Sequence, residues 1–244
     1  MNTNTKAALT VILIFTVTAS AIYIGTQTNK VIPAHDNDVL FQLAAFNTFS
    51  TGQFAGFMTY QELKQHGDFG IGTFNDLNGE MIALDGVFYQ IPSSGVPQEA
   101  DPIQTTPYAT ITYFNPTQTF EVSDIDYAGF QTFLDDQVSN ESIYAIKVHG
   151  IYSSIEARSP LKQTEPYPNI TDALKGQALF KLVDTSATAV GFYFPASMDG
   201  IDYTGYHFHV INDDHDAGGH ILDCHIQRAT VEIDEIKQYN LVLP

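Results

Sequence analysis

Histidines with the spacing of metal ligands are concentrated in residues 207–225, which hold five of the eight in the chain. Residues two apart in a β-strand point to the same face, so the imidazoles of His207 and His209 would form a ready pair of ligands. Residues 212–219 are rich in Asp, Asn and Gly, which is typical of a hairpin connection that returns His220 beside the first strand. Three converging imidazoles predict a metal centre with an open position. Zinc suits such donors first, and iron, manganese, nickel or copper are alternatives.

Three other residues of this stretch are not expected to bind the metal. His225 lies five positions after His220 and is opposite in parity, so it should face away. His215 falls in the predicted hairpin loop, where it would be exposed or lie just outside the ligand group. Cys224 is the one cysteine, so it cannot form an internal disulfide, and a small buried thiol on a strand is the expected state.

The elements that must position the histidines are mostly strands. Short apolar and aromatic segments at residues 69–74, 80–84 and 87–91 are joined by turn-forming residues, among them Asp85-Gly86, and predict a three-strand meander. Further strands are predicted at residues 110–114, 143–153, 180–183, 191–194, 206–211 and 220–228.

Few helices are predicted. Thr59 and Glu62 have capping-box spacing and indicate a short helix over residues 60–66. Apolar residues at helical spacing predict a second helix over residues 127–138, packed by its aromatic face, and a third is expected over residues 171–178.

A proline-rich stretch divides the chain. Residues 156–169 contain three prolines and are predicted to be neither regular helix nor central strand, so they are the candidate crossover between two halves. We therefore expect an α+β fold of mostly antiparallel or mixed β-sheets with a few short helices. Its halves would be residues 31–160 and residues 161–244, and the second would carry the metal-binding hairpin.

The charge balance limits the partners. The chain of 244 residues has 28 acidic residues against 10 Lys and Arg, which gives a net charge of −18 and a pI near 4.4. Phosphate binding requires clustered basic residues, so the composition argues against nucleic acid and against anionic lipid. Arg158 and Arg228 are the only arginines, so bidentate recognition of a carboxylate by a guanidinium group must use one of them.

The N-terminus has the pattern of an export signal. An apolar run over residues 7–24 follows Lys6, and Ala19-Ser20-Ala21 fits the small-x-small cleavage pattern. We expect residues 1–21 to be a signal peptide that is cleaved after Ala21, which makes the protein periplasmic or secreted. The alternative is an uncleaved N-terminal membrane anchor that extends to about residue 24.

Several separated motifs resemble those of the α-acetolactate decarboxylase family. They run in order over most of residues 40–243: HGDFGIGTF at residues 66–74, NGEMIALDGVFY at residues 78–89, RSP at residues 158–160, PY at residues 166–167, GYHFH at residues 205–209 and GGH at residues 218–220. The resemblance implies an α+β fold with two related halves, a homodimer, and a metal-dependent decarboxylation of 2-acetolactate to acetoin and CO2.

The resemblance also assigns site residues. It implies zinc held by His207, His209 and His220, with Arg158 and Glu80 as catalytic residues. Neighbouring residues alone suggest otherwise, because Glu80 follows Asn78-Gly79 like an exposed turn residue and Arg158 is spaced to pair with Glu156 at the surface. Family members continue into a C-terminal tail that supplies another active-site glutamate; this sequence stops at Pro244, so we expect that carboxylate to be missing or replaced.

The chemistry of these groups agrees with the implied reaction. Acetolactate has a hydroxyl and a ketone on adjacent carbons that can chelate a zinc ion, which would stabilise the enediolate formed when CO2 leaves. Arg158 would orient the substrate carboxylate, and Glu80 would then deliver a proton. Two alternatives remain: a zinc hydratase of the carbonic anhydrase type, and an exported metal-binding protein without catalysis.

Overall fold

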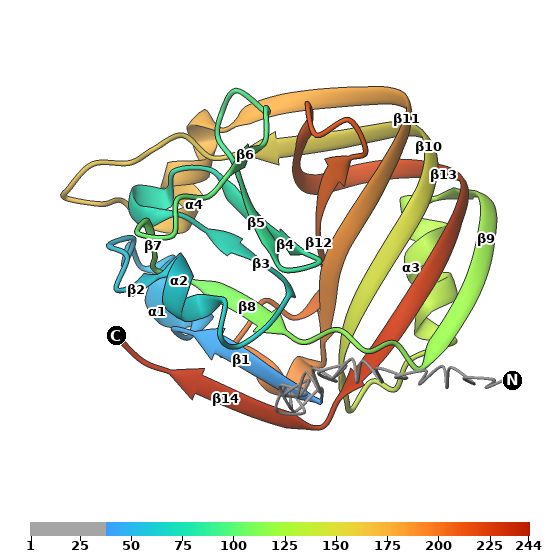
Figure 1. Ribbon diagram of the computed structural model, residues 1–244, viewed down its shortest axis with the longest axis horizontal. Helices are drawn as coiled ribbons and strands as arrows, with labels where there is room; N and C mark the ends of the chain where they lie inside the picture. The colour runs from blue at the N-terminus through green and yellow to red at the C-terminus, as the bar shows by residue number, and fades with distance from the viewer. Residues whose placement is uncertain (1–37) are drawn as a thin grey trace, which may run out of the picture. The chain divides into compact units, whose positions relative to one another are not determined.

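The computed structural model describes residues 38–244, and two large β-sheets dominate this part of the chain (Figure 1). The predicted signal peptide, residues 1–21, lies outside the described residues. The α+β class with mostly antiparallel sheets and few short helices, predicted from the sequence, is confirmed.

The first sheet has seven strands. In spatial order they are β14 (Gln238–Val242), β1 (Val39–Leu43), β8 (Ala109–Thr112), β3 (Phe69–Thr73), β4 (Glu80–Leu84), β5 (Val87–Ile91) and β6 (Gln98–Glu99). All neighbouring pairs are antiparallel except β1 and β14. Strands β3, β4 and β5 form the predicted meander. Asp85 and Gly86 have φ angles of 50° and 76°, the left-handed conformation that a tight two-residue hairpin turn requires.

The second sheet has five strands. In spatial order they are β10 (Ile143–Ser159), β11 (Ala178–Phe194), β12 (Gly205–Asn212), β13 (Gly218–Ile236) and β9 (Gln118–Asp126). Strand β13 pairs with β12 through residues 218–220 and with β10 along most of its length. Strands β10, β11, β12 and β13 therefore form a closed circuit of pairings. A small separate sheet pairs β2 (Met58–Thr59) with β7 (Thr105–Thr106).

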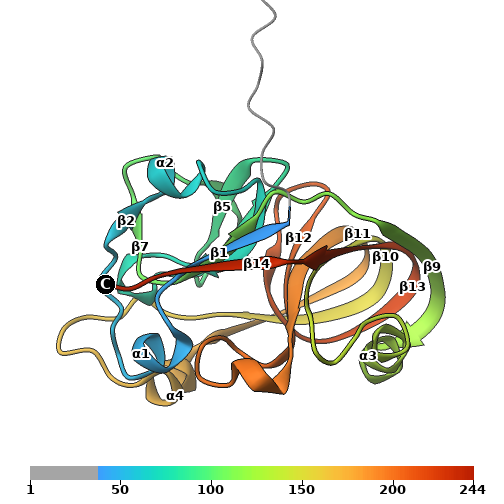
Figure 2. The ribbon, with the colours of Figure 1, turned by 90° about the horizontal axis from the view of Figure 1, so that it is seen from below.

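The helices of the described residues are short. They are α1 (Phe46–Ser50), α2 (Tyr60–Leu63), α3 (Tyr127–Asp135) and α4 (Ile170–Ala173), with 3-10 turns at Asn75–Leu77, Leu174–Gly176 and Ala196–Met198. The predicted capping box of Thr59 and Glu62 is present at the start of α2. Asp126 caps α3 by accepting a hydrogen bond from Gly129 N–H at 2.8 Å. Figure 2 shows α1 and α4, which contact each other, side by side.

An apolar core joins the two sheets. Ile71 and Ile82 of the first sheet belong to one buried cluster with Val190, Phe192 and Ile211 of the second. Strand β12 consequently contacts β4. This contact brings the strand that carries His207 and His209 against the strand that begins with Glu80, two segments far apart in the sequence.

Two sequence-based expectations about strands are wrong, and several strands were missed. Strand β10 continues through residues 156–159, which were expected to be irregular; it ends at Ser159 because the first proline of the stretch follows at Pro160. Residues 180–183 and 191–194 were expected as separate strands, and both belong to β11. Strands β1 and β9, and the two-residue strands β2, β6 and β7, were not predicted.

The sheets do not follow the order of the chain. Strands β9 and β10 precede residue 160 but pair with strands that follow it, and β14, near the C-terminus, pairs with β1. The two related halves, residues 31–160 and 161–244, stay a prediction.

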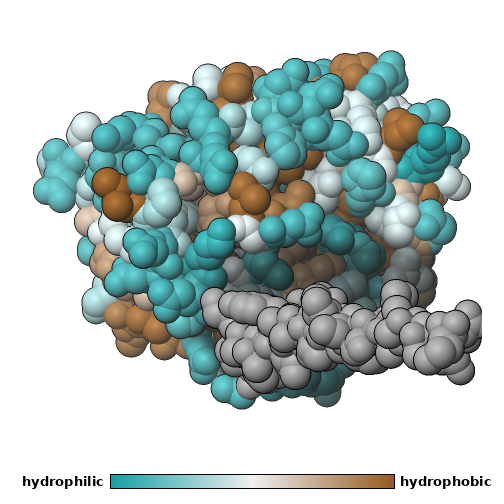
Figure 3. Space-filling view, viewed as in Figure 1, coloured by the Kyte–Doolittle hydropathy of each residue, from teal (hydrophilic) through white to brown (hydrophobic). Residues whose placement is uncertain are grey.

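The surface of the described residues is mixed. On the face shown in Figure 3, hydrophobic side chains are scattered among hydrophilic ones. The most exposed large apolar side chains are Ile103 at 75%, Leu179 at 66% and Leu243 at 62%. Among the described residues, no helix has the length and apolar character needed to cross a membrane.

Candidate metal centre and active site

The three predicted histidine ligands converge at the contact between β12 and β13. His207 and His209 lie two apart on β12, and His220 on β13 is directly opposite His209 in the antiparallel register. One ring nitrogen from each of the three lies within 4.8 Å of the others. The hairpin therefore returns His220 to the position that the sequence predicts.

His209 is held in one tautomer by the neighbouring sheet. Its Nδ1 lies 2.9 Å from the main-chain oxygen of Met81 in β4, so Nδ1–H donates and Nε2 carries the free lone pair. His209 is 1% exposed, and its Nε2 has no hydrogen-bond partner among the residues described. A buried ring nitrogen without a partner is unfavourable unless a ligand such as a metal ion completes it.

The other two imidazoles are in contact with each other. His207 Nε2 lies 3.0 Å from His220 Nδ1. Burial first, and then the neighbouring imidazoles and Arg158, hold the pKa of both rings well below its usual range. Burial likewise lowers the pKa of His209 to about 3. All three rings are therefore neutral at pH 7, which is the form that binds a metal.

Glu80 is a buried residue, so the exposed turn position suggested by its neighbours is wrong. It is the first residue of β4, and 7% of it is exposed. Its Oε2 lies 3.5 Å from His209 Nε2, and because that imidazole is neutral the contact is not an ion pair. Burial raises the pKa of Glu80 to about 7, although the positive charge of Arg158 opposes the rise.

Arg158 points into the same site rather than to the surface. Its Nη1 donates to Gln177 Oε1 at 2.9 Å, and its Nη2 lies 3.3 Å from His220 Nε2. The surface pair with Glu156, which sequence spacing alone suggests, is absent from the described residues, and that glutamate instead pairs with Lys181 at 3.7 Å. Residues two apart in a regular strand share a face, but a shift in the register of β10 against β13 between Glu156 and Ala157 interrupts this alternation, so Glu156 and Arg158 point in different directions.

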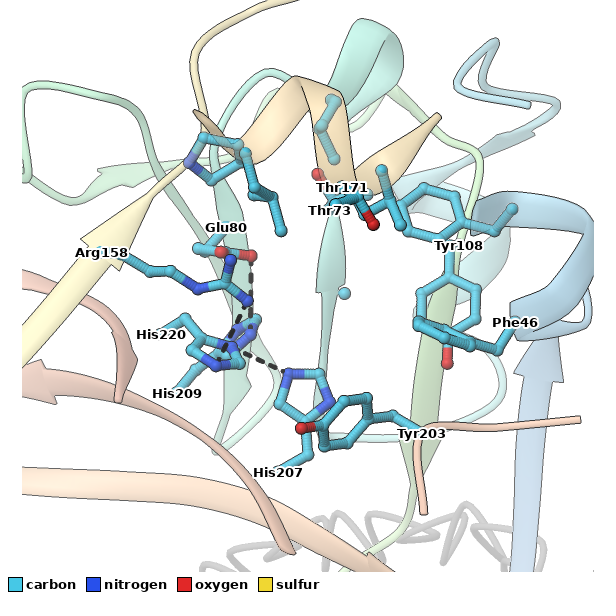
Figure 4. Close-up of a pocket in the computed structure, with 16 residues that line it drawn as sticks. Phe46, Thr73, Glu80, Tyr108, Arg158, Thr171, Tyr203, His207, His209 and His220 are labelled. Atoms are coloured by element: carbon cyan, nitrogen blue, oxygen red, sulfur yellow. Dashed lines mark hydrogen bonds and ion pairs between the residues drawn. The ribbon is translucent and has the colours of Figure 1, made fainter. Parts of the chain in front are cut away.

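A pocket of about 230 Å³ contains all five predicted site residues. The imidazoles, Glu80 and Arg158 form its polar side, and aromatic and aliphatic side chains form the rest (Figure 4). The lining residues not yet placed are Phe46, Phe49, Gly72, Thr73, Leu77, Tyr108, Pro160, Ile170, Thr171, Leu174 and Tyr203. Glu80 is the one carboxyl group in this lining of described residues.

Residues predicted to stay outside the ligand group do so. His225 lies 3.0 Å from Asp124 Oδ1 and does not belong to the histidine group. His215 is exposed, and its ring is 5.0 Å from that of Tyr89. Cys224 is a buried free thiol.

Sequence reasoning missed the apolar wall of the pocket, formed by Phe46, Tyr108 and Tyr203, and it missed the groups that hold the polar side chains in place. Tyr108 and Tyr203 carry no local signal, because ordinary core tyrosines look the same in a sequence. The contact with the Met81 main-chain oxygen could not be predicted either, because every residue has a main-chain carbonyl. Thr73 lies inside one of the recognised motifs, and its hydroxyl donates to the Gly79 oxygen at 2.7 Å beside Glu80.

Comparison with known proteins identifies the family. Residues 40–244 match the sequence profile of the family described as alpha-acetolactate decarboxylase. The chain belongs to this family.

Individual α-acetolactate decarboxylases agree in sequence and structure. The curated relative from Methanosarcina mazei is 38% identical over 210 residues, which cover 85% of this chain and 73% of the relative. The relative from Brevibacillus brevis is 37% identical and covers 87% of this chain and 75% of its own length. The crystal structure of the α-acetolactate decarboxylase from Bacillus subtilis strain 168 superposes with a TM-score of 0.83, 32% identity, and coverage of 84% of this chain and 89% of that one.

Proposed function

We propose that this protein decarboxylates 2-acetolactate (2-hydroxy-2-methyl-3-oxobutanoate) to acetoin and CO2, the activity for which its relatives are named. The proposal rests on one observation: a single pocket contains three neutral imidazoles, a buried carboxyl group and a guanidinium. These groups supply the ligands, the proton donor and the cation that such a reaction requires.

We infer that His207, His209 and His220 hold zinc. The free, buried Nε2 of His209 and the depressed pKa values of all three rings fit a divalent metal with imidazole preference. Other divalent transition metals suit the same donors. When bound, zinc acts as a Lewis acid that polarises the hydroxyl and ketone oxygens of the substrate and so favours the loss of CO2.

Arg158 binds and orients the substrate carboxylate. Among the described residues it has no carboxylate within ion-pair distance, and its partners are a neutral amide and a neutral imidazole. Its positive charge is therefore available in an otherwise acidic protein. The substrate carboxylate becomes neutral CO2 in the reaction, so this contact must orient the group without holding it more tightly than the transition state.

Glu80 supplies the proton. The bond from C2 to the carboxylate carbon breaks, CO2 leaves, and the electron pair stays on C2 conjugated with the ketone as an enediolate. A carboxyl group whose pKa is raised to about 7 is about half protonated at neutral pH, so a substantial fraction of Glu80 carries a proton that it can transfer to carbon. The resulting carboxylate recovers a proton from water, and acetoin is released.

The deciding experiment is an assay of acetoin release from racemic acetolactate by zinc-loaded protein, with stripped protein and His207→Ala as controls. We expect acetoin and CO2 in equal amounts from the loaded protein and almost none from the controls. Tight zinc binding without acetoin would favour a metal-binding protein, and CO2 hydration without acetoin would favour the hydratase.

We also propose export and dimerisation. The pattern at residues 1–21 supports cleavage after Ala21, and N-terminal sequencing of the mature protein checks this; a start at Met1 would contradict it. The family resemblance supports a homodimer, and light scattering after size exclusion measures it against the chain mass of 26.9 kDa.

A further inference from the structure

Asp202 is a buried carboxyl group that the proposed mechanism does not use. It is 2% exposed and lies in the loop that leads into β12. None of the ion pairs between described residues includes it. A buried carboxyl group without a cation is costly, so its hydrogen bonds must satisfy it.

Three donors surround this carboxyl group. Oδ1 accepts from the Tyr108 hydroxyl at 2.6 Å and from Tyr203 N–H at 2.6 Å. Oδ2 accepts from the Thr110 hydroxyl at 3.0 Å. Tyr108 and Thr110 belong to the first sheet or its margin, whereas Tyr203 belongs to the loop before β12. Asp202 therefore ties the first sheet to the loop that precedes the metal-binding strand.

The two tyrosines tied by Asp202 belong to the apolar wall of the pocket. Phe46 lies between them, with ring centroids 6.1 Å from Tyr108 and 5.9 Å from Tyr203. The Tyr203 ring lies 5.3 Å from that of His207. In Figure 4, Phe46 and Tyr108 lie across the pocket from Arg158 and the carboxyl group beside it.

Tyr203 has few other restraints. It is 47% exposed, and its loop contains Gly200 and Gly205 with φ angles of 79° and 85°, a conformation that glycine adopts without strain. Hydrogen bonds that a carboxylate accepts are among the stronger ones in proteins. The contact of Tyr203 N–H with the Asp202 carboxyl group therefore fixes one end of the wall.

We propose that Asp202 is a positioning residue that fixes Tyr108 and Tyr203, and that this wall limits the size of the alkyl group on C2 of the substrate. The identity of the substrate rests on the proposed function. If the carboxylate, hydroxyl and ketone of acetolactate faced the polar side of the pocket, the C2 methyl group would face the apolar wall. Apolar pockets discriminate between alkyl groups by fit.

Binding of two unreactive analogues tests the proposal without turnover. In both, the ketone is reduced to an alcohol, which blocks decarboxylation, and C2 carries either methyl or ethyl. Calorimetry with zinc-loaded protein gives the ratio of the methyl to the ethyl affinity. We expect Asp202→Ala to lower this ratio about fivefold or more. Asp202→Asn should keep the ratio within about twofold of the wild-type value, because the amide oxygen can still accept hydrogen bonds from the Tyr108 hydroxyl and from Tyr203 N–H.

Two further variants separate positioning from folding. Tyr108→Phe keeps the ring but removes one of the donors to Asp202, so it should lower the ratio even if Asp202→Ala does not fold. Asp199→Ala changes an exposed carboxylate of the same loop and should leave the ratio at the wild-type value.

The outcomes are distinct. A lower melting temperature with an unchanged ratio in both Asp202→Ala and Tyr108→Phe would overturn the proposal and leave Asp202 a purely structural role. Failure of the wild type to bind either analogue would also overturn it. Failure of the wild type to release acetoin while the ratio changes as expected would contradict the proposed function alone.

Discussion

His209 donates its Nδ1–H to the main-chain oxygen of Met81 across the contact between the two sheets, at 2.9 Å. This bond orients the ring, fixes its tautomer and leaves Nε2 as the only metal ligand that His209 can offer. Met81 directly follows Glu80 in β4. One strand therefore both supplies the buried carboxyl group and orients a metal-binding imidazole beside it.

Replacing His209 by Asn should separate its two roles. The Asn amide can still donate to the Met81 oxygen, but it has no counterpart of Nε2. We expect zinc affinity to fall about 100-fold or more, with the free energy of unfolding of the metal-free protein close to the wild-type value. Competition with a chromophoric chelator and urea unfolding measure the two quantities.

The matched variant is His209→Ala. It removes the donor as well as the ligand, so the Met81 oxygen loses its partner in a buried site. The free energy of unfolding of the metal-free protein should therefore be about 1–3 kcal/mol lower than that of His209→Asn. Equal stability of the Ala and Asn variants would contradict the role assigned to the Met81 contact.

Replacing Glu80 by Gln should remove turnover but not the metal. The amide is close in size to the carboxyl group but cannot act as an acid, so kcat should fall about 100-fold to 10,000-fold while zinc stays bound in a 1:1 ratio. Acetoin release and metal analysis of the same sample test this. Glu99→Gln, at an exposed position of β6, is the control and should be fully active. Near-normal turnover of Glu80→Gln would exclude the proton-donor role.

Replacing Arg158 by Gln should raise the pKa of Glu80. Burial already raises this pKa to about 7, and the guanidinium opposes the rise by favouring the carboxylate. Without the positive charge, the protonated form persists to higher pH. Carbon-13 NMR titration of the metal-free protein measures the shift, and Glu80→Gln assigns the resonance. An unchanged or lower pKa would show that Arg158 does not act on this carboxyl group.

Asp202 should make stability depend on pH. Burial raises its pKa from an ordinary value of 3.8 to about 6 in the folded protein, and its hydrogen bonds limit the rise. Between pH 4 and pH 6 the folded state therefore keeps a proton on Asp202 that the unfolded state releases. The contribution of Asp202 to the free energy of unfolding is present below pH 4 and is lost as the pH rises through 6.

The matched comparison is Asp202→Asn, which cannot titrate. The free energy of unfolding of the wild type, minus that of the variant, should fall by about 2 kcal/mol between pH 4 and pH 7. Urea unfolding of the metal-free proteins measures this difference. A difference that stays constant or grows over this range would contradict the raised pKa.

The sequence by itself determined the features that follow from local spacing. Alternation along a strand places His207 and His209 on one face, and the loop after them returns His220. The Thr59 cap and the Asp85-Gly86 turn depend on side chains and φ angles within a few residues, so both were predicted. The family motifs added Glu80, which local rules place in an exposed turn.

The tertiary structure alone decided the environments of those residues. Glu80 is buried because β4 packs against β12, a contact between segments distant in the sequence. The partner of Arg158, the Met81 oxygen that orients His209, and the carboxyl group of Asp202 behind the aromatic wall come from such contacts too. Desolvation and long-range hydrogen bonds set pKa values and tautomers, and neither is encoded in the spacing of neighbouring residues.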